Sequence, residues 1–191
     1  MRVIGGSARG RRLLAPRGLD TRPTSDKVKE ALFSILAGMT GPLDGCSVLD
    51  IFAGTGSLGI EAMSRGAACA VFIDAGREAA AVLRKNLETT GFADKGRVLV
   101  QDFPAALARL ERDGRTFRLV FLDPPYRKGL LEKCLVRLAQ SPLLEEDAVV
   151  VAELSSRDEL GAAFGPLLLC DRRVYGDTAL TFFTMTRKGS P

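Results

Sequence analysis

The chain has 191 residues, of which 46% are hydrophobic and 26% are charged, and its formal net charge is +4. This composition is typical of one soluble domain with a full core, and there is neither an 18-residue apolar run nor a secretory signal, so we expect a cytoplasmic protein with no membrane partner. The sequence has no histidine, which excludes Ser-His-Asp and Cys-His nucleophile systems and imidazole metal ligands.

The first 23 residues are rich in Gly, Arg and Pro, and we expect a basic arm over 1–23 that precedes a domain over 24–191. Two strand-like pieces, RVIGG and RRLLA, flank a Gly/Ser/Ala turn and predict a hairpin. Residues 1–30 hold eight basic and three acidic side chains, so this segment carries +5 and the rest of the chain −1. A polyanionic partner, most commonly nucleic acid, would explain the arm; a solvated basic tail is the alternative.

After the arm, a helix is followed by a regular alternation of strands and helices. Thr24, Ser25 and Asp26 are all capping residue types, and the apolar residues from Val28 to Leu36 have helical spacing. Five strand-like runs follow at 46–52, 69–75, 97–102, 117–123 and 147–154. Helical runs separate them at 57–66, 77–91, 104–114 and 128–141. This alternation predicts an α/β fold with a doubly wound, mainly parallel sheet.

The end of the chain, at 167–187, contains two further strand-like runs around a Gly-Asp turn. It predicts an antiparallel hairpin at one edge of the sheet, which brings the expected number of strands to seven. The four cysteines are scattered and form no Cys-x-x-Cys pair, which argues against a zinc site or a redox dithiol. We therefore expect no metal, and we also expect a monomer.

The stretch VLDIFAGTGSLGIEA, at 48–62, follows a strand and opens a helix. Gly54, Gly56 and Gly59 in it form G-x-G-x-x-G, a pattern that lets a backbone approach a ligand closely above a helix N-terminus. Asp50 comes just before this loop. Its carboxylate would oppose a pyrophosphate, but it would suit a cofactor that carries a cationic centre and an ammonium group.

Three more aspartates end predicted strands, and open α/β sheets bind their ligands at these ends. Asp74 lies 24 residues after Asp50, where an acid can accept hydrogen bonds from ribose hydroxyls. Asp102, which is followed by Phe103, could hold an adenine amino group beside an aromatic ring. Asp123 begins the sequence DPPY, whose prolines stiffen the chain as it leaves the sheet. For any single one of these acids, a turn-forming or capping role is the alternative.

With DIFAGTG, FID and DPPY in this order, residues 46–187 resemble the class I S-adenosylmethionine-dependent methyltransferases. DPPY is similar to the signature of those that methylate exocyclic amines of nucleobases. The arm, RVIGGSARGRRL with RPTSDKVKEALFSIL, resembles the bacterial family that methylates guanine N2 in 16S ribosomal RNA. The resemblance implies a Rossmann-like methyltransferase fold and S-adenosylmethionine as cofactor. It also implies ribosomal RNA, in the small subunit or an assembly intermediate, as partner.

The same resemblance implies a role for each matching residue. The methionine end of the cofactor would be lined by Asp50, Phe52, Ala53, Gly54, Thr55 and Gly56. Asp74 would hold the ribose, and Asp102 with Phe103 the adenine. The catalytic residues would be Asp123, Pro124 and Tyr126, with Pro125 and Tyr126 also contacting the target base. The substrate-binding residues of the arm would be Arg9, Arg11, Arg12, Arg22 and Thr24, the arginines through RNA phosphates.

DPPY fits this chemistry because the amine of guanine is a poor nucleophile that must be positioned. The Asp123 carboxylate and the Pro124 carbonyl could bind its two N–H groups and direct the nitrogen lone pair at the methyl group. Asp123 could then take the released proton. Tyr126 could stack on a base turned out of its helix or loop, although a core or rim tyrosine is the alternative.

Three other functions are compatible with parts of this pattern. An adenine-N6 DNA methyltransferase can also carry DPPY, and Asp123 stands where many amine methyltransferases have Asn. However, 191 residues leave little room for a separate target-recognition segment. A non-catalytic RNA-binding or ribosome-assembly factor would predict a damaged glycine loop or DPPY, and both are intact. An NAD-dependent oxidoreductase is disfavoured by Asp50 and by the missing histidine.

Overall fold

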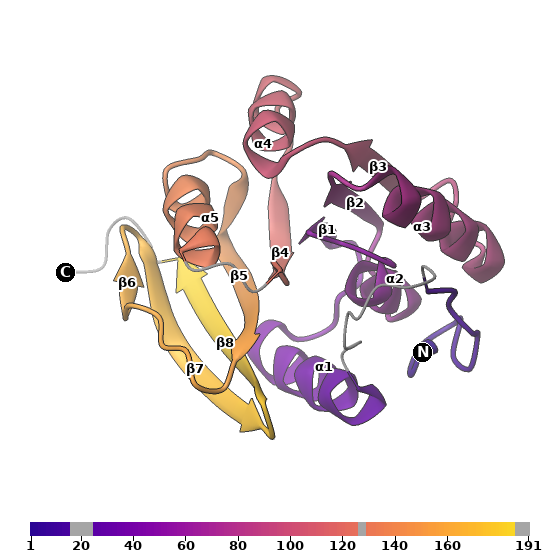
Figure 1. Cartoon of the computed structure of the whole chain (residues 1–191), viewed down its shortest axis with the longest axis horizontal. Helices are drawn as coiled ribbons and strands as arrows, with labels where there is room; N and C mark the ends of the chain where they lie inside the picture. The colour runs from indigo at the N-terminus through magenta and orange to yellow at the C-terminus, as the bar shows by residue number, and fades with distance from the viewer. Residues whose placement is uncertain (16–24, 126–128, 186–191) are drawn as a thin grey trace.

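A single sheet with helices on both faces forms the centre of the molecule (Figure 1). The computed structural model describes residues 1–15, 25–125 and 129–185. Within these ranges eight strands lie in the order β3-β2-β1-β4-β5-β8-β7-β6. The parallel strands are β1 (Ser47–Ile51), β2 (Cys69–Asp74), β3 (Gly96–Val100), β4 (Phe117–Leu122) and β5 (Leu144–Ser155). The predicted doubly wound, mainly parallel sheet is confirmed.

The antiparallel strands extend the sheet beyond β5. They are β8 (Thr178–Met185), β7 (Leu167–Tyr175) and β6 (Ala163–Phe164). The β7–β8 pair is the hairpin that the Gly-Asp turn predicted. The sheet has one strand more than the seven expected because the chain folds back before β7, where the two residues of β6 pair with Leu167 and Leu168.

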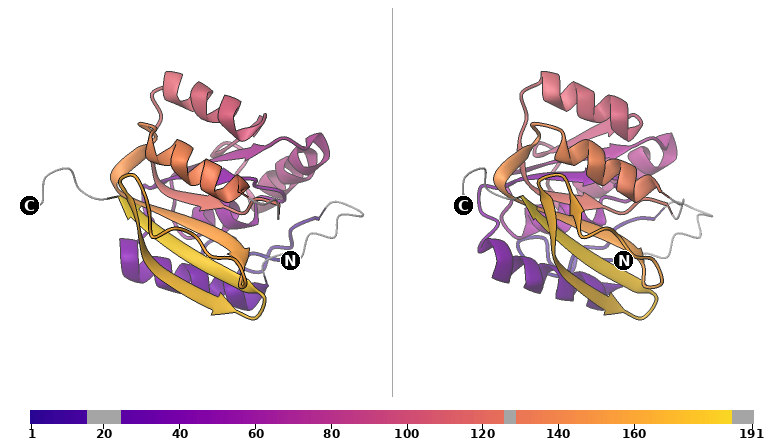
Figure 2. Two further views of the ribbon diagram at one scale, coloured as in Figure 1. Left: turned by 60° about the vertical axis from the view of Figure 1, so that its left-hand side comes forward. Right: turned by 90° about the vertical axis from the view of Figure 1, so that its left-hand side faces the viewer.

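Five helices cover the two faces of the sheet in the described part of the chain (Figures 1 and 2). They are α1 (Asp26–Thr40), α2 (Ser57–Ser64), α3 (Arg77–Thr90), α4 (Phe103–Arg112) and α5 (Leu130–Ala139). Side chains of α1, α2 and α3 belong to one buried cluster and those of α4 and α5 to the other. None of these described helices is long and apolar enough to cross a membrane.

The strand sequences explain why the sheet has a core on each face. Successive side chains of a strand point to opposite faces, and in β1 Val48 joins the first cluster while Leu49 joins the second. In β4, Phe121 joins the first cluster and Leu122 the second. Both residue sets are apolar, so the inner strands appear in the sequence as continuous apolar runs.

Local signals fix where several helices begin and end. The Ser25 hydroxyl accepts a hydrogen bond from the Val28 N–H at 3.3 Å, which caps α1. The Asp102 carboxylate caps α4 in the same way by accepting from the Ala105 N–H at 3.0 Å. At the other end of a helix, Gly91 adopts a left-handed conformation and ends α3.

Residues 1–15 form a folded arm that lies against α2 and α3 (Figure 1). An antiparallel bridge joins Arg2 and Arg12, and the Val3 N–H donates to the Arg11 carbonyl at 2.9 Å. The side chains of Val3, Ala8 and Leu13 are buried in the same cluster as α1 and α2. The arm therefore contributes to the core of the domain, although its arginines point outward.

Candidate active site

The carboxyl ends of β1, β2, β4 and β5 bring four acidic side chains to one edge of the sheet. Asp50 lies in β1, Asp74 ends β2, Asp123 follows β4 and Glu153 lies near the end of β5. The backbone N–H of Asp123 donates to the Ile51 carbonyl at 3.5 Å, which joins the exit of β4 to the exit of β1. The predicted neighbourhood of Asp50, Asp74 and Asp123 thus exists in the structure.

The glycine loop leaves β1 through a sequence of left-handed residues. Phe52 has φ 64°, Gly54 φ 54° and Gly56 φ 76°, a region that side chains other than glycine adopt at a cost. Gly56 also has no room for a side chain, because a Cβ there would lie 2.0 Å from Leu83 Cδ1. The positive φ angles therefore determine the path of the loop, which leads directly into the N-terminus of α2.

Asp50 lies buried beneath this loop. It is 2% exposed, and its Oδ2 accepts a hydrogen bond from the Gly59 N–H in the first turn of α2 at 3.0 Å. Burial raises the pKa of Asp50 to about 7, with a smaller contribution from the charge of Asp74, against the lowering effect of the Gly59 N–H. A buried carboxylate with this pKa is stabilised in its ionised form by any cation bound nearby.

Asp74 fixes the loop from the neighbouring strand. Its Oδ2 accepts from the Gly54 N–H at 2.8 Å and its Oδ1 from the Gly76 N–H at 2.7 Å. Each oxygen has a further lone pair, so the carboxylate could also accept from a ligand hydroxyl. Asp74 therefore has a structural role besides the predicted one, since it connects the glycine loop to the start of α3.

Asp102 and Phe103 follow β3, which ends at Val100, and they lie at the start of α4. Asp102 is exposed, and one of its oxygens caps α4, so the capping alternative describes part of its role. The Phe103 ring lies 5.9 Å from the Phe52 ring in a tilted arrangement. The two predicted cofactor segments, after β1 and after β3, thus meet through an aromatic pair.

The corner after β4 adjoins the exit of β1 through Asp123 and lines a cavity through Pro124 and Pro125. Burial of its carboxyl group, followed by the charges of Glu153 and Asp50, raises the pKa of Asp123 well above its usual range. The residue as a whole is exposed, as is Pro125, whereas Pro124 is buried. A cavity of about 700 Å³ opens beside the two prolines, between the end of β4 and the loop after β5.

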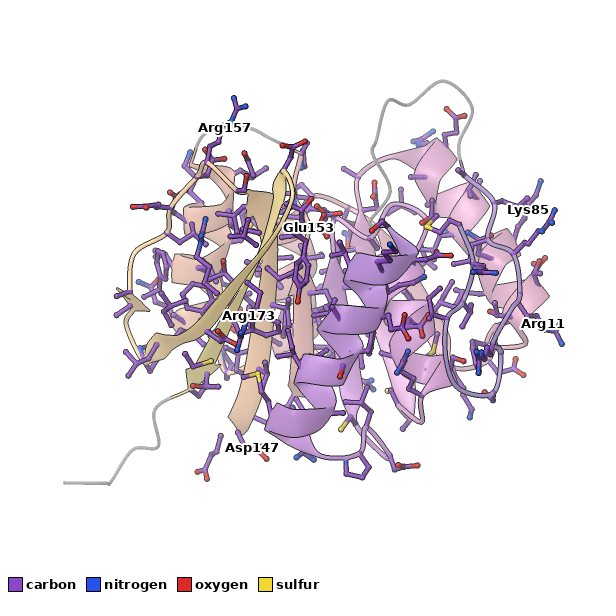
Figure 3. All side chains as sticks on the ribbon, turned by 90° about the horizontal axis from the view of Figure 1, so that it is seen from below. Arg11, Lys85, Asp147, Glu153, Arg157 and Arg173 are labelled. Atoms are coloured by element: carbon purple, nitrogen blue, oxygen red, sulfur yellow. The ribbon has the colours of Figure 1, made fainter. Side chains whose placement is uncertain are left out.

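The remaining predicted site residues fall into two sets. Arg22, Thr24 and Tyr126 lie outside the residues that the structure describes. Arg9, Arg11 and Arg12 are exposed on the arm. Figure 3 shows Arg11 and Lys85 of α3 on one side of the molecule, and Arg157, which lines the cavity, on the other. The basic surface and the cavity are thus separate features.

Sequence reasoning missed the buried polar residues that fasten the arm to the domain. The two oxygens of Glu61, in α2, accept from the Ile4 and Gly5 N–H groups, each at 2.8 Å. The Lys29 ammonium, in α1, lies 3.6 Å from Glu61 Oε2 and donates to the Arg2 carbonyl at 2.6 Å. Lys29 and Glu61 are both 0% exposed. Burial lowers the pKa of Lys29 and the charge of Glu61 opposes that shift.

Asn86 provides a second connection between the arm and the site. Its amide group pairs with Leu14, accepting from the Leu14 N–H at 2.8 Å and donating to the Leu14 carbonyl at 3.1 Å. The same Nδ2 donates to the carbonyl of Thr55 in the glycine loop at 2.9 Å. Asn86 is fully buried, so the arm, α3 and the glycine loop share one satisfied polar contact.

These features fit S-adenosylmethionine better than a dinucleotide. The buried Asp50 carboxylate beneath the glycine loop suits an ammonium and a sulfonium and would repel a pyrophosphate. Asp74, Phe52 and Phe103 supply an acceptor and aromatic rings along the neighbouring strand ends. Among the described residues, no group of three His, Cys, Asp or Glu side chains is arranged to hold a metal ion.

The strand order and the glycine loop at β1 define the fold as that of a Rossmann-like methyltransferase. The chain belongs to the family described as conserved hypothetical protein 95, whose model matches residues 1–184. It is 40% identical over 184 residues to YlbH of Bacillus subtilis, covering 96% of this chain and 98% of that protein.

A curated sequence and a solved structure from Escherichia coli extend the comparison. Ribosomal RNA small subunit methyltransferase D of strain K12 is 35% identical over 189 residues, which cover 99% of this chain and 92% of that protein. The solved structure of the methyltransferase-like protein yhhF superimposes with a TM-score of 0.83 at 36% identity, covering 98% and 99% of the two chains. The resemblance to a methyltransferase family is therefore confirmed over nearly the whole chain.

Proposed function

We propose that this protein transfers a methyl group from S-adenosylmethionine to the exocyclic N2 amine of a guanine in 16S ribosomal RNA. The observation that carries the proposal is the position of the Asp123–Pro125 corner. Its backbone is hydrogen-bonded to the exit of β1, where the glycine loop begins, and its two prolines line the 700 Å³ cavity. A cofactor at the loop and a base at the cavity would meet at Asp123.

The ribosomal substrate is supported by a relative and by the basic arm. The 35% identical Escherichia coli protein is named a ribosomal RNA small subunit methyltransferase. The arm presents exposed Arg9, Arg11 and Arg12 beside exposed Arg84 and Lys85 of α3. Such a surface suits RNA phosphates, which supply salt-sensitive and largely sequence-independent affinity. We place the protein in the cytoplasm, where its substrate is made.

S-adenosylmethionine supplies a methyl group that is already activated by its sulfonium. The chain's own residues then position the amine, because the Asp123 carboxylate and the Pro124 carbonyl can accept its two N–H groups. Transfer forms an N–C bond and breaks an S–C bond, and the nitrogen must lose a proton. The raised pKa of Asp123 makes its carboxylate a better acceptor for that proton than an ordinary aspartate would be.

The proposal is tested by mass spectrometry of ribosomal RNA from cells that lack the protein. We expect one N2-methylguanosine of 16S ribosomal RNA to disappear, and to return when the wild-type gene but not Asp123→Ala is supplied. In parallel, the purified protein and labelled S-adenosylmethionine are incubated with 16S ribosomal RNA, small subunits and duplex DNA. Label in N6-methyladenine of the DNA, or unchanged ribosomal RNA in the deletion strain, would overturn the proposal.

A further inference from the structure

Thr55, in the middle of the glycine loop, is held in place from outside the loop. It stands between Gly54 and Gly56, which have φ 54° and 76°, and glycines restrict the backbone less than any other residues do. The Ala53 N–H donates to the Ile73 carbonyl at 3.0 Å, and the Gly56 N–H donates to the Ala53 carbonyl at 2.7 Å. Thr55 lies between these two anchored positions, so its own peptide group needs a further contact.

That contact comes from Asn86, on the buried face of α3. The Asn86 Nδ2 donates to the Thr55 carbonyl at 2.9 Å. Leu83, one turn earlier in α3, packs so closely on the neighbouring Gly56 that a Cβ there would lie 2.0 Å from Leu83 Cδ1. The helix therefore fixes the loop with an apolar contact at Gly56 and with a hydrogen bond at Thr55.

The arm determines which end of the Asn86 amide faces the loop. The Leu14 N–H can only donate, so it requires the amide oxygen, Oδ1, which accepts from it at 2.8 Å. The Leu14 carbonyl can only accept, and it takes one hydrogen of Nδ2 at 3.1 Å. The second hydrogen of Nδ2 is thereby directed to Thr55. Without Leu14, the amide could turn its oxygen toward the Thr55 carbonyl, and two acceptors would then face each other.

Leu14 is held in turn by the fold of the arm. The side chain of Leu13 is buried in the α1–α3 cluster, and the Leu13 N–H donates to the Met1 carbonyl at 3.1 Å. Met1 also contacts the loop, because the Thr55 hydroxyl donates to its sulfur at 3.8 Å. Both ends of residues 1–15 are therefore connected to Thr55, one end directly and the other through Asn86.

We propose that Asn86 is a positioning residue of the cofactor site, and that the arm is part of that site because it orients the Asn86 amide. The inference rests on the proposed function, since it takes S-adenosylmethionine as the ligand of the glycine loop. A loop that is not held at Thr55 samples conformations that cannot bind, and the apparent Kd rises as the competent fraction falls. The segment that is expected to bind RNA thus also prepares the protein for its cofactor.

The test is calorimetry of S-adenosylmethionine binding to the full-length protein and its variants. We expect Asn86→Ala to raise the Kd by about 3- to 10-fold, which corresponds to the loss of one intramolecular hydrogen bond. In the protein without cofactor, hydrogen exchange at the Gly56 amide should also accelerate in this variant. The exchange measurement reports on the loop with no ligand present.

Thr90→Val is the matched control on the same helix. Thr90 is buried, and its hydroxyl donates to the backbone carbonyls of Asn86 and Leu87 at 2.7 Å and 3.2 Å. The variant therefore removes a buried hydrogen-bonding group from α3, while the contacts of the Asn86 amide remain. It should keep the wild-type Kd. Equal weakening in Asn86→Ala and Thr90→Val would trace the effect to the stability of α3 and would overturn the inference.

A second pair of variants tests the contribution of the arm. Leu14→Pro removes the N–H that orients the amide, whereas Leu14→Ala keeps this N–H and shortens a side chain that is 52% exposed. We expect Leu14→Pro, but not Leu14→Ala, to raise the Kd by about 2- to 10-fold. When it is combined with Asn86→Ala, Leu14→Pro should add less than about twofold, because the contact through which it acts is already lost.

The outcomes separate this inference from the proposed function. If wild type does not bind S-adenosylmethionine, the proposed function fails and the inference fails with it. If wild type binds the cofactor and Asn86→Ala binds it equally tightly, Asn86 does not position the loop and the proposed function stands. A raised Kd in Asn86→Ala with no change in Leu14→Pro, or effects that simply add in the double variant, would show that the arm takes no part and would also overturn the inference.

Discussion

The protonation of Asp123 is the property on which the chemistry of the site depends. Burial and the charges of Glu153 and Asp50 favour its neutral form, whereas a group that takes up the amine proton must be ionised beforehand. A cation bound near Asp50 would lower both pKa values by direct charge interaction. Asp50 and Asp123 are therefore suited to a cationic cofactor. When that positive charge is present, Asp123 is ionised and can accept the amine proton.

Replacing Asp123 should separate catalysis from cofactor binding. We expect Asp123→Ala to lower the rate of methyl transfer by about 10²- to 10⁴-fold, the contribution of a positioned proton acceptor. The affinity for S-adenosylmethionine, measured by calorimetry, should change little, because the contacts of the glycine loop with Asp74 and of Asp50 with Gly59 remain. Loss of cofactor binding in step with activity would contradict this assignment.

Asp50 should make the free energy of unfolding depend on pH. Its folded pKa of about 7 lies above the usual value of 3.8, so the folded state keeps a proton that the unfolded chain releases. The folded protein should therefore lose about 1.4 kcal/mol per pH unit from this group as pH rises from about 4 to 7, and nothing more above that.

Asp50→Asn tests this prediction, because it removes the titrating group while its amide oxygen can still accept from the Gly59 N–H. Urea unfolding at pH 5 and pH 8 should show a smaller loss of stability for Asp50→Asn than for wild type. Parallel stability profiles for the two proteins would show that Asp50 does not titrate in this range.

At the scale of single residues, the sequence predicted the acids that end strands but not those inside helices. Asp50, Asp74 and Asp123 follow apolar runs, and parallel strands bring their ends together whatever the remaining packing. Glu61 and Lys29 are paired across α1, α2 and the arm, and no spacing along the chain encodes that meeting. A signal did exist for Glu61, which is the only charged residue in the stretch from Leu58 to Ser64; the structure buries that whole stretch.

At the scale of elements, the arm is held by a close backbone approach to α2. Gly6 has φ 74°, and a Cβ there would lie 1.7 Å from the Ser64 carbonyl oxygen. The Ser7 N–H donates to this same carbonyl at 2.7 Å, and the Ala8 N–H donates to the Ser64 hydroxyl at 2.9 Å. A side chain at position 6 would therefore separate the arm from α2.

Two glycines of the arm provide a matched comparison. Gly6→Ala and Gly10→Ala both place alanine at positive φ, which costs roughly 1–2 kcal/mol, but nothing lies within 4 Å of a Cβ at Gly10. We expect hydrogen exchange at the Ser7 and Ala8 amides to accelerate strongly in Gly6→Ala and only slightly in Gly10→Ala. Equal exchange in the two variants would mean that the approach to Ser64 does not hold the arm.

The elements themselves were largely predictable, and the deviations have physical causes. Strands and helices alternate with clear apolar periods and glycine stops, so the order of the fold follows from the sequence. The two-residue strand β6 was not predictable, because its pairing with β7 depends on how the chain after β5 folds back. The left-handed Phe52 was also unexpected, since bulky residues rarely adopt positive φ.

At the scale of the whole molecule, the charge is divided between two surfaces. The arm and α3 present exposed basic residues, and the cavity is bordered by Glu132, Glu153, Asp158 and Glu159 with Arg157. An RNA backbone would be attracted to the first surface and repelled by the second. A base that is extruded from the RNA reaches the cavity without its phosphates having to follow, which the proposed function requires.

Charge reversal on the arm should weaken RNA binding in a salt-dependent way. In the double variant Arg9→Glu and Arg12→Glu, Arg11 is kept because its guanidinium donates to the Thr89 carbonyl at 2.7 Å. We expect weaker binding to 16S ribosomal RNA, most of all at low salt, and a slope of log affinity against log salt that is shallower by roughly 0.7–0.9 per lost phosphate contact.

Arg112→Glu is the control for this experiment, because Arg112 is exposed at the end of α4, on the other face of the sheet. It should keep the wild-type slope in filter-binding or fluorescence titrations. If the double variant and the control have the same slope, the arm does not contact phosphates.

The buried ion pair of Lys29 and Glu61 makes the first fifteen residues inseparable from the rest of the protein. A gene shortened to start at codon 25 would encode a chain whose Glu61 loses two N–H donors and whose Lys29 loses the Arg2 carbonyl. The pair itself would remain, but each buried donor or acceptor that is left without its partner costs about 1–3 kcal/mol, which is a large part of the stability of a small domain. Deletion of the arm would thus yield an unstable protein. Substitutions of exposed arm residues are therefore the better way to test whether the arm binds RNA.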